Sequence, residues 1–253
     1  MRFSSLGSGS KGNATLVHAD DTLILIDCGF SIRETEKRLS RLGVSAQDLT
    51  SILVTHEHSD HLRGVLPLAK KYRLTVKMTA GTCRSLKDLS NVNVELIDSH
   101  HSFTVGSVDV TPVSVPHDAR EPVQYVLGSA GLTLGVLTDI GSITPHVIDS
   151  YQRCDGLLLE FNHDPIMLAN GSYPSFLKDR VAGAWGHLNN DQALYFLQQL
   201  KLEQLQQLVI GHISEKNNCL KLIRSVMSEV EELLSSIHYA TQEQEAAWFK
   251  FQP

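Results

Sequence analysis

Residues 55–61 hold the densest group of metal-binding side-chain types in the chain. They read Thr-His-Glu-His-Ser-Asp-His and come directly after the apolar run at 51–54. Imidazoles and carboxylates are costly to desolvate together unless a cation lies among them. The motif therefore predicts a metal site at the end of a buried strand, in preference to a metal-free surface run of His, Glu and Asp.

The spacing within this motif predicts two ions. His56 and His58 are two residues apart, so in an extended segment both rings can face the same ion. Asp60 and His61 begin the next turn and can face a second ion. The order His-x-His-x-Asp-His is far more specific than an isolated His-x-His.

A polar side chain at the end of an apolar strand recurs along the chain. It is found at Asp27, His117, Asp139 and His212, and in the tetrad at 161–164. We predict that His117 is a metal ligand and that Asp139 bridges two cations, because a carboxylate has two oxygens. Asp27 has two explanations, a turn cap or a residue that orients a metal ligand, and a metal-centred fold favours the second.

Alternating strands and helices must position these residues. Strands are expected at 14–17, 22–27, 74–78, 92–97, 156–160, 208–214, 237–240 and 248–251, with hairpins at 103–113 and 123–138. Helices are expected at 31–42, 63–72, 79–89, 144–151, 191–201 and 217–234. Ser31 and Glu34 form an expected capping box, and Pro67 is expected to interrupt the second helix early. With no linker or low-complexity stretch, we predict one domain over 1–253 built from two similar halves.

Two basic segments each have two explanations. The glycine-rich stretch at 7–13 is either a hairpin turn or a nest of backbone N–H groups, with Lys11 beside it, for an anionic group of a substrate. It lacks the Gly-Lys-Ser/Thr ending of a Walker loop. Arg33, Lys37 and Arg41 recur every four residues of the first helix, which favours a solvated face over a phosphate contact.

Composition limits the function classes. The 253 residues are 42% hydrophobic and 20% charged, which is ordinary for a soluble globular protein. The formal charge of −6 argues against a globally basic nucleic-acid coat protein but permits a local basic groove. No apolar run approaches the roughly 18 residues of a membrane span, and the first residues are rich in Gly and Ser, so a cytoplasmic protein is expected. The four cysteines have no C-x-x-C pair and are expected to be free thiols, mainly buried.

The order of Asp27, the motif at 56–61, His117, Asp139 and His212 resembles the metallo-β-lactamase superfamily over nearly the whole chain. The resemblance implies an α/β fold, a four-layer αββα sandwich, with two divalent ions (Zn²⁺ or Mn²⁺) at the sheet edge. By this resemblance, one ion is held by His56, His58 and His117 and the other by Asp60, His61 and His212, with Asp139 and a hydroxide between them. Class B1 and B2 β-lactamases have Cys at the Asp139 position, so antibiotic hydrolysis is not expected.

Segments outside the ligands are similar to the YycJ/WalJ-like branch of that superfamily. They are Ser-Gly-Ser-Lys-Gly-Asn at 8–13, Asn-His-Asp at 162–164, Tyr-Pro at 173–174, Leu-Lys at 177–178, Gly-His-Leu-Asn-Asn at 186–190, His-Ile-Ser at 212–214 and Asn-Asn at 217–218. The branch is associated with 5′-to-3′ exonuclease action on double-stranded DNA and with mismatch repair, so DNA and DNA-repair proteins are the implied partners. Glu160-Phe161 and Asn189 depart from its usual pattern, and we expect them to alter the pocket floor without removing a ligand.

The resemblance implies phosphodiester hydrolysis with the metal-bridging hydroxide as nucleophile. Asp60 and His187 are the expected catalytic residues, with His187 at the scissile phosphate or the leaving group. The alternative for His187 is a helix-entry residue bonded to Asn190. The expected substrate-binding residues are Ser10, Lys11, Asn162, His163, Lys178, Arg180, His187 and Ser214.

Other functions remain open at this point. A small-molecule phosphodiesterase acting on cyclic or nucleotide phosphates has the same fold. A glyoxalase-type thioesterase would not need Lys11, Lys178 and Arg180, and the interval between Asp139 and His212 is too short for the inserted domain of a β-CASP ribonuclease. The non-enzyme alternative is a DNA-binding module in which the ions only hold the fold.

Overall fold

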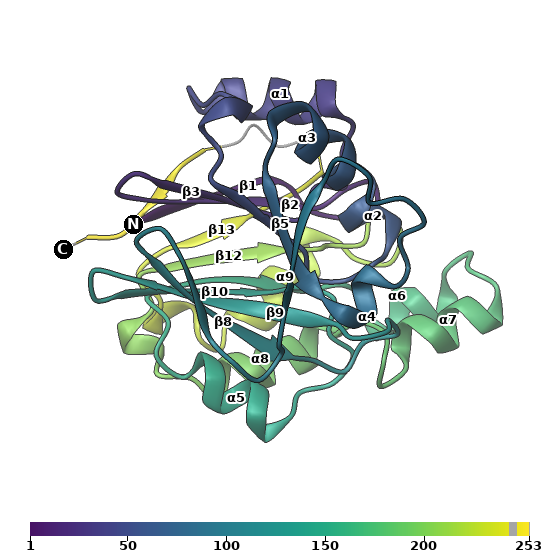
Figure 1. Ribbon diagram of the computed structural model, residues 1–253. Coiled ribbons are helices and arrows are strands. Elements are labelled where there is room, and N and C mark those ends of the chain that lie inside the picture. Colours follow the sequence, from purple (N-terminus) through teal and green to yellow (C-terminus); the bar gives the residue numbers. More distant parts are fainter. Residues whose placement is uncertain (243–246, 253) are drawn as a thin grey trace.

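The structure is a computed structural model that describes residues 1–242 and 247–252. Two seven-stranded sheets lie face to face, and helices cover their outer faces (Figure 1). This arrangement confirms the expected αββα sandwich. In the described part of the chain, no helix is long and apolar enough to cross a membrane.

The first sheet has the strand order β14-β1-β2-β3-β4-β5-β6. Its strands are β1 (Arg2–Gly7), β2 (Ala14–Ala19), β3 (Thr22–Ile26), β4 (Ser51–Leu53), β5 (Thr75–Thr79), β6 (Asn93–Ile97) and β14 (Phe249–Lys250). Pairing is antiparallel from β14 to β3 and parallel from β3 to β6.

The second sheet has the order β13-β12-β11-β10-β9-β8-β7. Its strands are β7 (Phe103–Val105), β8 (Val108–Ser114), β9 (Val123–Ser129), β10 (Leu132–Leu137), β11 (Gly156–Glu160), β12 (Gln207–Gly211) and β13 (Ile237–Tyr239). Pairing is antiparallel from β7 to β10 and parallel from β10 to β13. The topology of the first sheet is therefore repeated, with β3 and β10 at the change from antiparallel to parallel pairing.

The continuous apolar strands of the sequence are buried on both faces. In β3, Ile24 packs in the core between the sheets, whereas Leu25 packs on the outer face. In β11, Leu158 likewise faces the other sheet, whereas Leu159 packs on the outer face. Strands covered on both sides have no polar face, so their sequences do not alternate. Polar side chains can therefore gather only beyond the buried parts of these strands, at the carboxyl ends of the parallel strands.

The described helices are α1 (Ile32–Arg41), α2 (Ser59–Leu62), α3 (Val65–Tyr72), α4 (Ala80–Cys83), α5 (Pro145–Tyr151), α6 (Pro165–Asn170), α7 (Ser175–Ala182), α8 (Asn190–Gln198) and α9 (Leu220–Met227). Ser31 caps α1 by accepting from the Glu34 N–H, but the Glu34 carboxylate pairs with Arg38. Pro67 does not interrupt α3, because it lies in the first turn, where its missing N–H leaves no helical bond unmade.

Three helix predictions were too long. The segment at 79–89 is helical only in α4, where the Gly81 N–H is bound to Glu121 and the helix ends within one turn. The segment at 217–234 contains α9 and a separate 3-10 turn at Glu231–Leu233, and α9 starts late because Asn218 bonds to the Phe161 carbonyl before the helix begins. The helix predicted at 191–201 ends at Gln198.

Two smaller predictions are settled by side-chain exposure. The basic residues Arg33, Lys37 and Arg41 are all exposed, so they form the expected solvated face of α1. All four cysteines are free thiols, as expected. Only Cys28 and Cys154 are buried, however, while Cys83 is half-buried and Cys219 is exposed.

Candidate metal centre

The histidine motif leaves the first sheet as an extended segment and then turns into a helix. After β4 the chain stays extended to His58, which precedes α2 with φ −61° and ψ 145°. Asp60 and His61 lie on α2 itself. The change from extended chain to helix separates the side chains of His58 and Asp60, but the rings of His56 and His61 stay close, with centroids 4.2 Å apart. The division of the motif between two ions therefore stays a prediction.

Three imidazoles meet on one side of the site. The ring centroids of His56, His58 and His117 lie 4.6–5.0 Å apart in all three pairings. His56 and His117 are buried and His58 is half-buried. One nitrogen from each ring can reach a common cation. The structure thus brings together the three residues that the resemblance assigned to the first ion.

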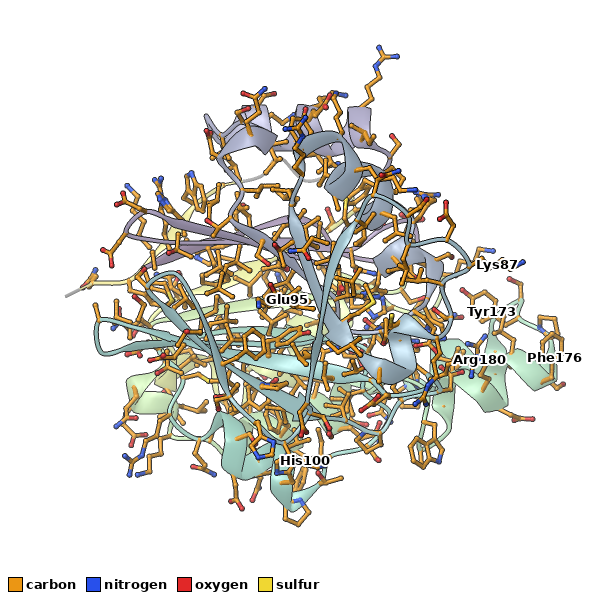
Figure 2. The ribbon with its side chains drawn as sticks, viewed as in Figure 1. Lys87, Glu95, His100, Tyr173, Phe176 and Arg180 are labelled. Atoms are coloured by element: carbon orange, nitrogen blue, oxygen red, sulfur yellow. The ribbon has the colours of Figure 1, made fainter. Side chains whose placement is uncertain are left out.

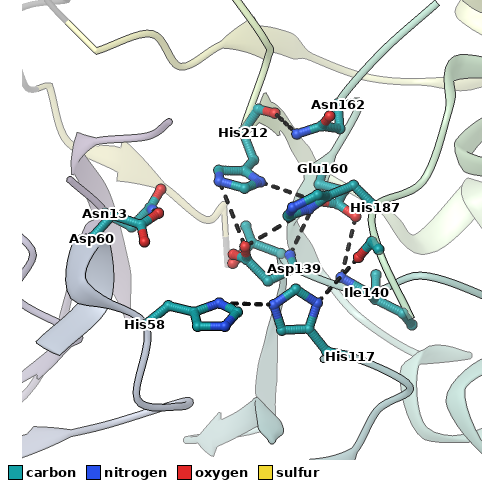
Figure 3. Close-up of polar contacts among 12 residues, drawn as sticks. Asn13, His58, Asp60, His117, Asp139, Ile140, Glu160, Asn162, His187 and His212 are labelled. Atoms are coloured by element: carbon teal, nitrogen blue, oxygen red, sulfur yellow. Dashed lines mark hydrogen bonds and ion pairs between the residues drawn. The ribbon is translucent and has the colours of Figure 1, made fainter. Parts of the chain in front are cut away.

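Asp139 lies between this trio and a second group (Figure 3). His61 Nε2 is 3.1 Å from Asp139 Oδ2, and His212 Nε2 is 3.6 Å from Asp139 Oδ1. Asp60 Oδ2 is 3.5 Å from His61 Nε2. Asp60, His61 and His212 can together hold a cation, and Asp139 also groups with His56 and His61.

Two buried acceptors at this position lack hydrogen-bond partners, which fits a bound cation. His56 Nδ1 is bonded to Thr55, and its buried Nε2 has no partner. The His61 ring that donates Nδ1–H to Asp27 has its Nε2 3.1 Å from Asp139 Oδ2, which has no hydrogen bond, and 3.0 Å from the Asn13 side-chain amide nitrogen. Buried acceptors that face each other are costly unless a cation lies between them. The donor set therefore fits divalent metal.

The electrostatics of His61 lead to the same conclusion. Burial opposes its protonation, but the carboxylates of Asp139 and Asp27 outweigh burial and raise the pKa of His61 well above the ordinary value. In contrast, burial lowers the pKa of His56 well below the ordinary value. A cation bound beside Asp139 would supply the positive charge that the carboxylates favour and would leave both rings neutral for coordination.

Asp27 orients two members of the motif. Its Oδ1 accepts from the Thr55 N–H and its Oδ2 from the Thr55 hydroxyl, both at 2.8 Å, and Oδ2 also accepts from His61 Nδ1 at 2.8 Å. Thr55 in turn contacts His56 Nδ1. These hydrogen bonds fix Thr55 and the His61 ring, which is the arrangement that the predicted orienting role of Asp27 requires. Asp27, Asp139 and His212 all have left-handed backbone, with φ of 60°, 54° and 51°, a strain that surrounding contacts must hold in place.

Glu160, at the end of β11, was expected only to alter the pocket floor, and its contacts to the site histidines were not predicted. Its Oε2 accepts from His187 Nδ1 at 3.1 Å, His212 Nδ1 at 3.0 Å and the Asp139 N–H at 3.0 Å, and its Oε1 accepts from the Leu188 N–H. Burial opposes its ionisation, yet His187 and His212 outweigh burial and lower the pKa of Glu160 to about 2. A carboxylate closing an apolar strand was the available signal, as at Asp27 and Asp139.

His187 faces the site from the turn before α8. Its ring centroid lies 5.4 Å from that of His117 and 5.0 Å from that of His212. The alternative in which His187 bonds to Asn190 is wrong, because the Asn190 side chain pairs with Asn218. His187 is instead held by Glu160 through Nδ1, which leaves Nε2 for the site.

A cavity of about 430 Å³ opens over these residues. Its lining includes the metal-site residues His58, Asp60, Asp139 and His212, together with His187. Four of the predicted substrate-binding residues also line it: Ser10, Asn162, Arg180 and Ser214. Asn162 donates from Nδ2 to the His212 carbonyl, so part of its amide supports the metal-site loop.

Three predicted substrate-binding residues, all in the described part of the chain, do not line this cavity: Lys11, His163 and Lys178. His163 is only 2% exposed, and burial lowers its pKa to about 4, so it belongs to the core beneath the site. Lys178 donates to the Ala169 carbonyl and Lys11 pairs with Glu215, both at the surface. The sequence does not reveal that His163 is buried or that Lys11 and Lys178 bind other groups at the surface.

The stretch at 7–13 is the hairpin turn between β1 and β2. Its N–H groups bond within the protein: Gly9 to Asn13 Oδ1, Lys11 to Gln242 Oε1, Gly12 to the Gly9 carbonyl and Asn13 to the Asp60 carbonyl. These four groups are not directed at a shared anion. The nest alternative is therefore wrong, and the turn instead anchors α2, the helix that carries Asp60.

The site has the ligand order and the strand-end placement described above, and the profile of the beta-lactamase superfamily domain matches residues 22–213. The chain belongs to the beta-lactamase superfamily. Within this superfamily, it is 32% identical over 236 residues to exodeoxyribonuclease YycJ of Bacillus anthracis, covering 92% of this chain and 89% of the relative. It is 30% identical over 233 residues to exodeoxyribonuclease WalJ of Streptococcus pneumoniae, covering 90% and 87%.

A solved structure of the same superfamily agrees in fold. The metallo-β-lactamase fold protein YhfI from Bacillus subtilis superposes with a TM-score of 0.73 at 16% identity, covering 98% of this chain and 99% of that one. The family, the metal-fitting donor set and the cavity together identify this beta-lactamase superfamily member as a metal-dependent hydrolase.

Proposed function

We propose that the chain is a nuclease, a metal-dependent phosphodiester hydrolase that degrades DNA from 5′ to 3′. The observation that carries the proposal is Asp139, a buried carboxylate between two groups of ligand-type residues at the floor of an open cavity. Nitrogen and oxygen donors of this kind suit divalent ions that act on phosphoryl groups. The relatives named exodeoxyribonuclease support DNA as the substrate. DNA-repair partners and a cytoplasmic location belong to the same proposal.

Two divalent ions, Zn²⁺ or Mn²⁺, would polarise a phosphoryl oxygen and lower the pKa of a bound water. The residues that would hold them are His56, His58, Asp60, His61, His117, Asp139 and His212.

The remaining polar residues of the cavity have roles that follow from their contacts. Arg180 lines the cavity with a side chain that is 57% exposed, and its guanidinium suits a phosphate of the substrate. His187 donates Nδ1–H to Glu160, which fixes the ring with Nε2 free to face the cavity. In this proposal His187 is the general acid, and its Nε2 delivers a proton to the leaving 3′-oxygen.

The test is the time course of cleavage of a linear duplex labelled at the 5′ end of one strand and the 3′ end of the other, with Mn²⁺ or Zn²⁺. Early release of the 5′ label as mononucleotides, with stepwise shortening of the 3′-labelled strand, is expected. His58→Ala protein is the control and should release neither label. Hydrolysis of bis-p-nitrophenyl phosphate without cleavage of duplex, single strand or RNA would instead indicate a small-molecule phosphodiesterase.

A further inference from the structure

A pair of helices projects from the body of the protein beside the cavity. Figure 1 shows α6 and α7 extending beyond both sheets, and α7 has no buried residue. Ile166, Phe176 and Trp185, in this segment, are 71%, 72% and 62% exposed. Exposed apolar residues are normally scattered singly, so three large ones between positions 166 and 185 single out this segment as a place to look for a binding surface.

The projecting segment is also a wall of the cavity. Tyr173, Leu177, Arg180 and Val181 all line the cavity. Phe176 lies four residues before Arg180 on α7 and therefore on the same side of the helix, about 6 Å farther out along its axis. Figure 2 shows Phe176 at the outer end of α7, with Arg180 and Tyr173 nearer the body. The exposed face of α7 therefore runs from Arg180, at the cavity, outward to Phe176.

Positive charge accompanies the aromatic rings. Arg180 is held by Asp118, which in turn lies 3.7 Å from His58. Across the rim, Lys216 Nζ lies 5.5 Å from the centre of the Tyr173 ring, and both residues line the cavity. Cationic side chains that follow a backbone, beside aromatic faces that accept bases, are the arrangement that binds single-stranded nucleic acid.

We propose that α7 is the platform along which a DNA strand leaves the cavity, with Arg180 at a phosphate and the Phe176 ring stacked on an unpaired base. The inference rests on the proposed nuclease function and adds the element that holds the polymer. DNA fits better than a second protein, because the surface continues directly into the catalytic cavity and has cations along its inner end. A protein-binding face would have no reason to share residues with the cavity lining.

The experiment compares wild type with Phe176→Ala on two substrates in Mn²⁺: DNA with an unpaired end, and bis-p-nitrophenyl phosphate, which is too small to reach Phe176. Loss of one base stack should raise KM for DNA roughly 10-fold. That loss should exceed any change on the small substrate by at least fivefold. Phe176→Trp should restore binding, and Leu96→Ala, at another exposed apolar position (β6, 61% exposed), should match wild type.

A direct readout uses phosphorothioate DNA, which resists cleavage, with 2-aminopurine at successive positions from the end. Wild type should quench the fluorescence at one position, and Phe176→Ala should not. DNA kinetics and quenching within twofold of wild type in Phe176→Ala would overturn the inference, as would equal losses on both substrates. A change of oligomeric state with unchanged DNA binding would assign the surface to a second copy. Wild type that hydrolyses the small substrate but neither cuts nor binds DNA would overturn the nuclease proposal itself.

Discussion

Each sheet carries a buried aspartate just beyond the strand where its pairing changes, and the two aspartates have different hydrogen-bond partners. Asp27 follows β3 and Asp139 follows β10, the strands where antiparallel pairing changes to parallel, and both residues are buried with left-handed backbone. Both oxygens of Asp27 accept hydrogen bonds from Thr55 or His61, whereas Asp139 Oδ2 accepts none. One half of the fold thus uses the position as a support, and the other half uses it to present an acceptor to the site.

The difference originates on the neighbouring strand. In the first half, Asp27 accepts from the backbone N–H of Thr55, beyond β4. In the second half the direction is reversed: Glu160, at the end of β11, accepts from the backbone N–H of Asp139. Because the Glu160 carboxylate on the adjacent strand binds the Asp139 backbone, the Asp139 side chain is free to face the cavity. Repeated topology therefore supplies two equivalent positions, and the neighbouring residue decides which becomes a ligand.

Replacing the presented carboxylate should have the largest effect. Asp139→Asn keeps the size but removes the charge, so metal affinity and hydrolysis should fall by more than about 100-fold, the upper range for residues that only support ligands. Metal content by mass spectrometry and kcat/KM on bis-p-nitrophenyl phosphate measure both. Zn²⁺ should raise Tm of wild type and not of the variant. A variant that retains metal and wild-type rates would remove Asp139 from the centre.

Glu160→Gln should come next. Glu160 positions His187 and His212 together, so we expect kcat to fall roughly 100-fold, with KM for the small substrate nearly unchanged. His187→Ala alone is the matched comparison: if Glu160 acts through His187, the double variant should lose little more than the worse single variant. Fully multiplicative losses would show that the two residues act separately.

Asp27→Asn should have a smaller effect on the same assays. It weakens two contacts to Thr55 and one to His61 but removes no ligand, so a loss of about 10-fold to 100-fold in metal affinity is expected. Saturating metal should restore most of the rate, which it should not do for Asp139→Asn. Equal and unrecoverable losses in the two variants would contradict the assigned difference between the halves.

The smallest expected effects come from the buried thiols, Cys28 in the first half and Cys154 in the second. Burial raises the pKa of Cys28, in the first half, to about 11 and that of Cys154, in the second, to about 12. Both thiols should resist a thiol reagent at pH 8 while exposed Cys219 reacts. Because the unfolded thiols ionise near pH 8.5, their contribution to folding stability is complete below that pH and is lost as pH rises toward 11 or 12. A fall in Tm between pH 8 and pH 10, reduced in Cys28→Ala, is the expected result.

The strands and the clustered motif were predictable because their signals are local. Apolar runs such as 22–26 and 156–160 are long enough to be recognised without knowledge of the partner strand. The helix ends at 79–89 and 217–234 were not predictable, since long-range bonds from Glu121 and Phe161 decide them. Similarly, nothing near Lys178 or His163 in the sequence shows that one turns to a surface carbonyl and the other lies in the core.

From the sequence, apolar patterning predicted alternating strands and helices and ligand chemistry predicted a metal site, because both are properties of residue types and spacing. The resemblance to the metallo-β-lactamase superfamily implied the four-layer fold and the full set of ligands. Only the tertiary structure decided which role each of the three buried carboxylates has. Asp27, Asp139 and Glu160 are equivalent in the sequence, each an acid at or just after the end of an apolar strand. Which one supports, which one positions the histidines and which one faces the cavity depends on the neighbours that strand pairing brings within hydrogen-bond reach.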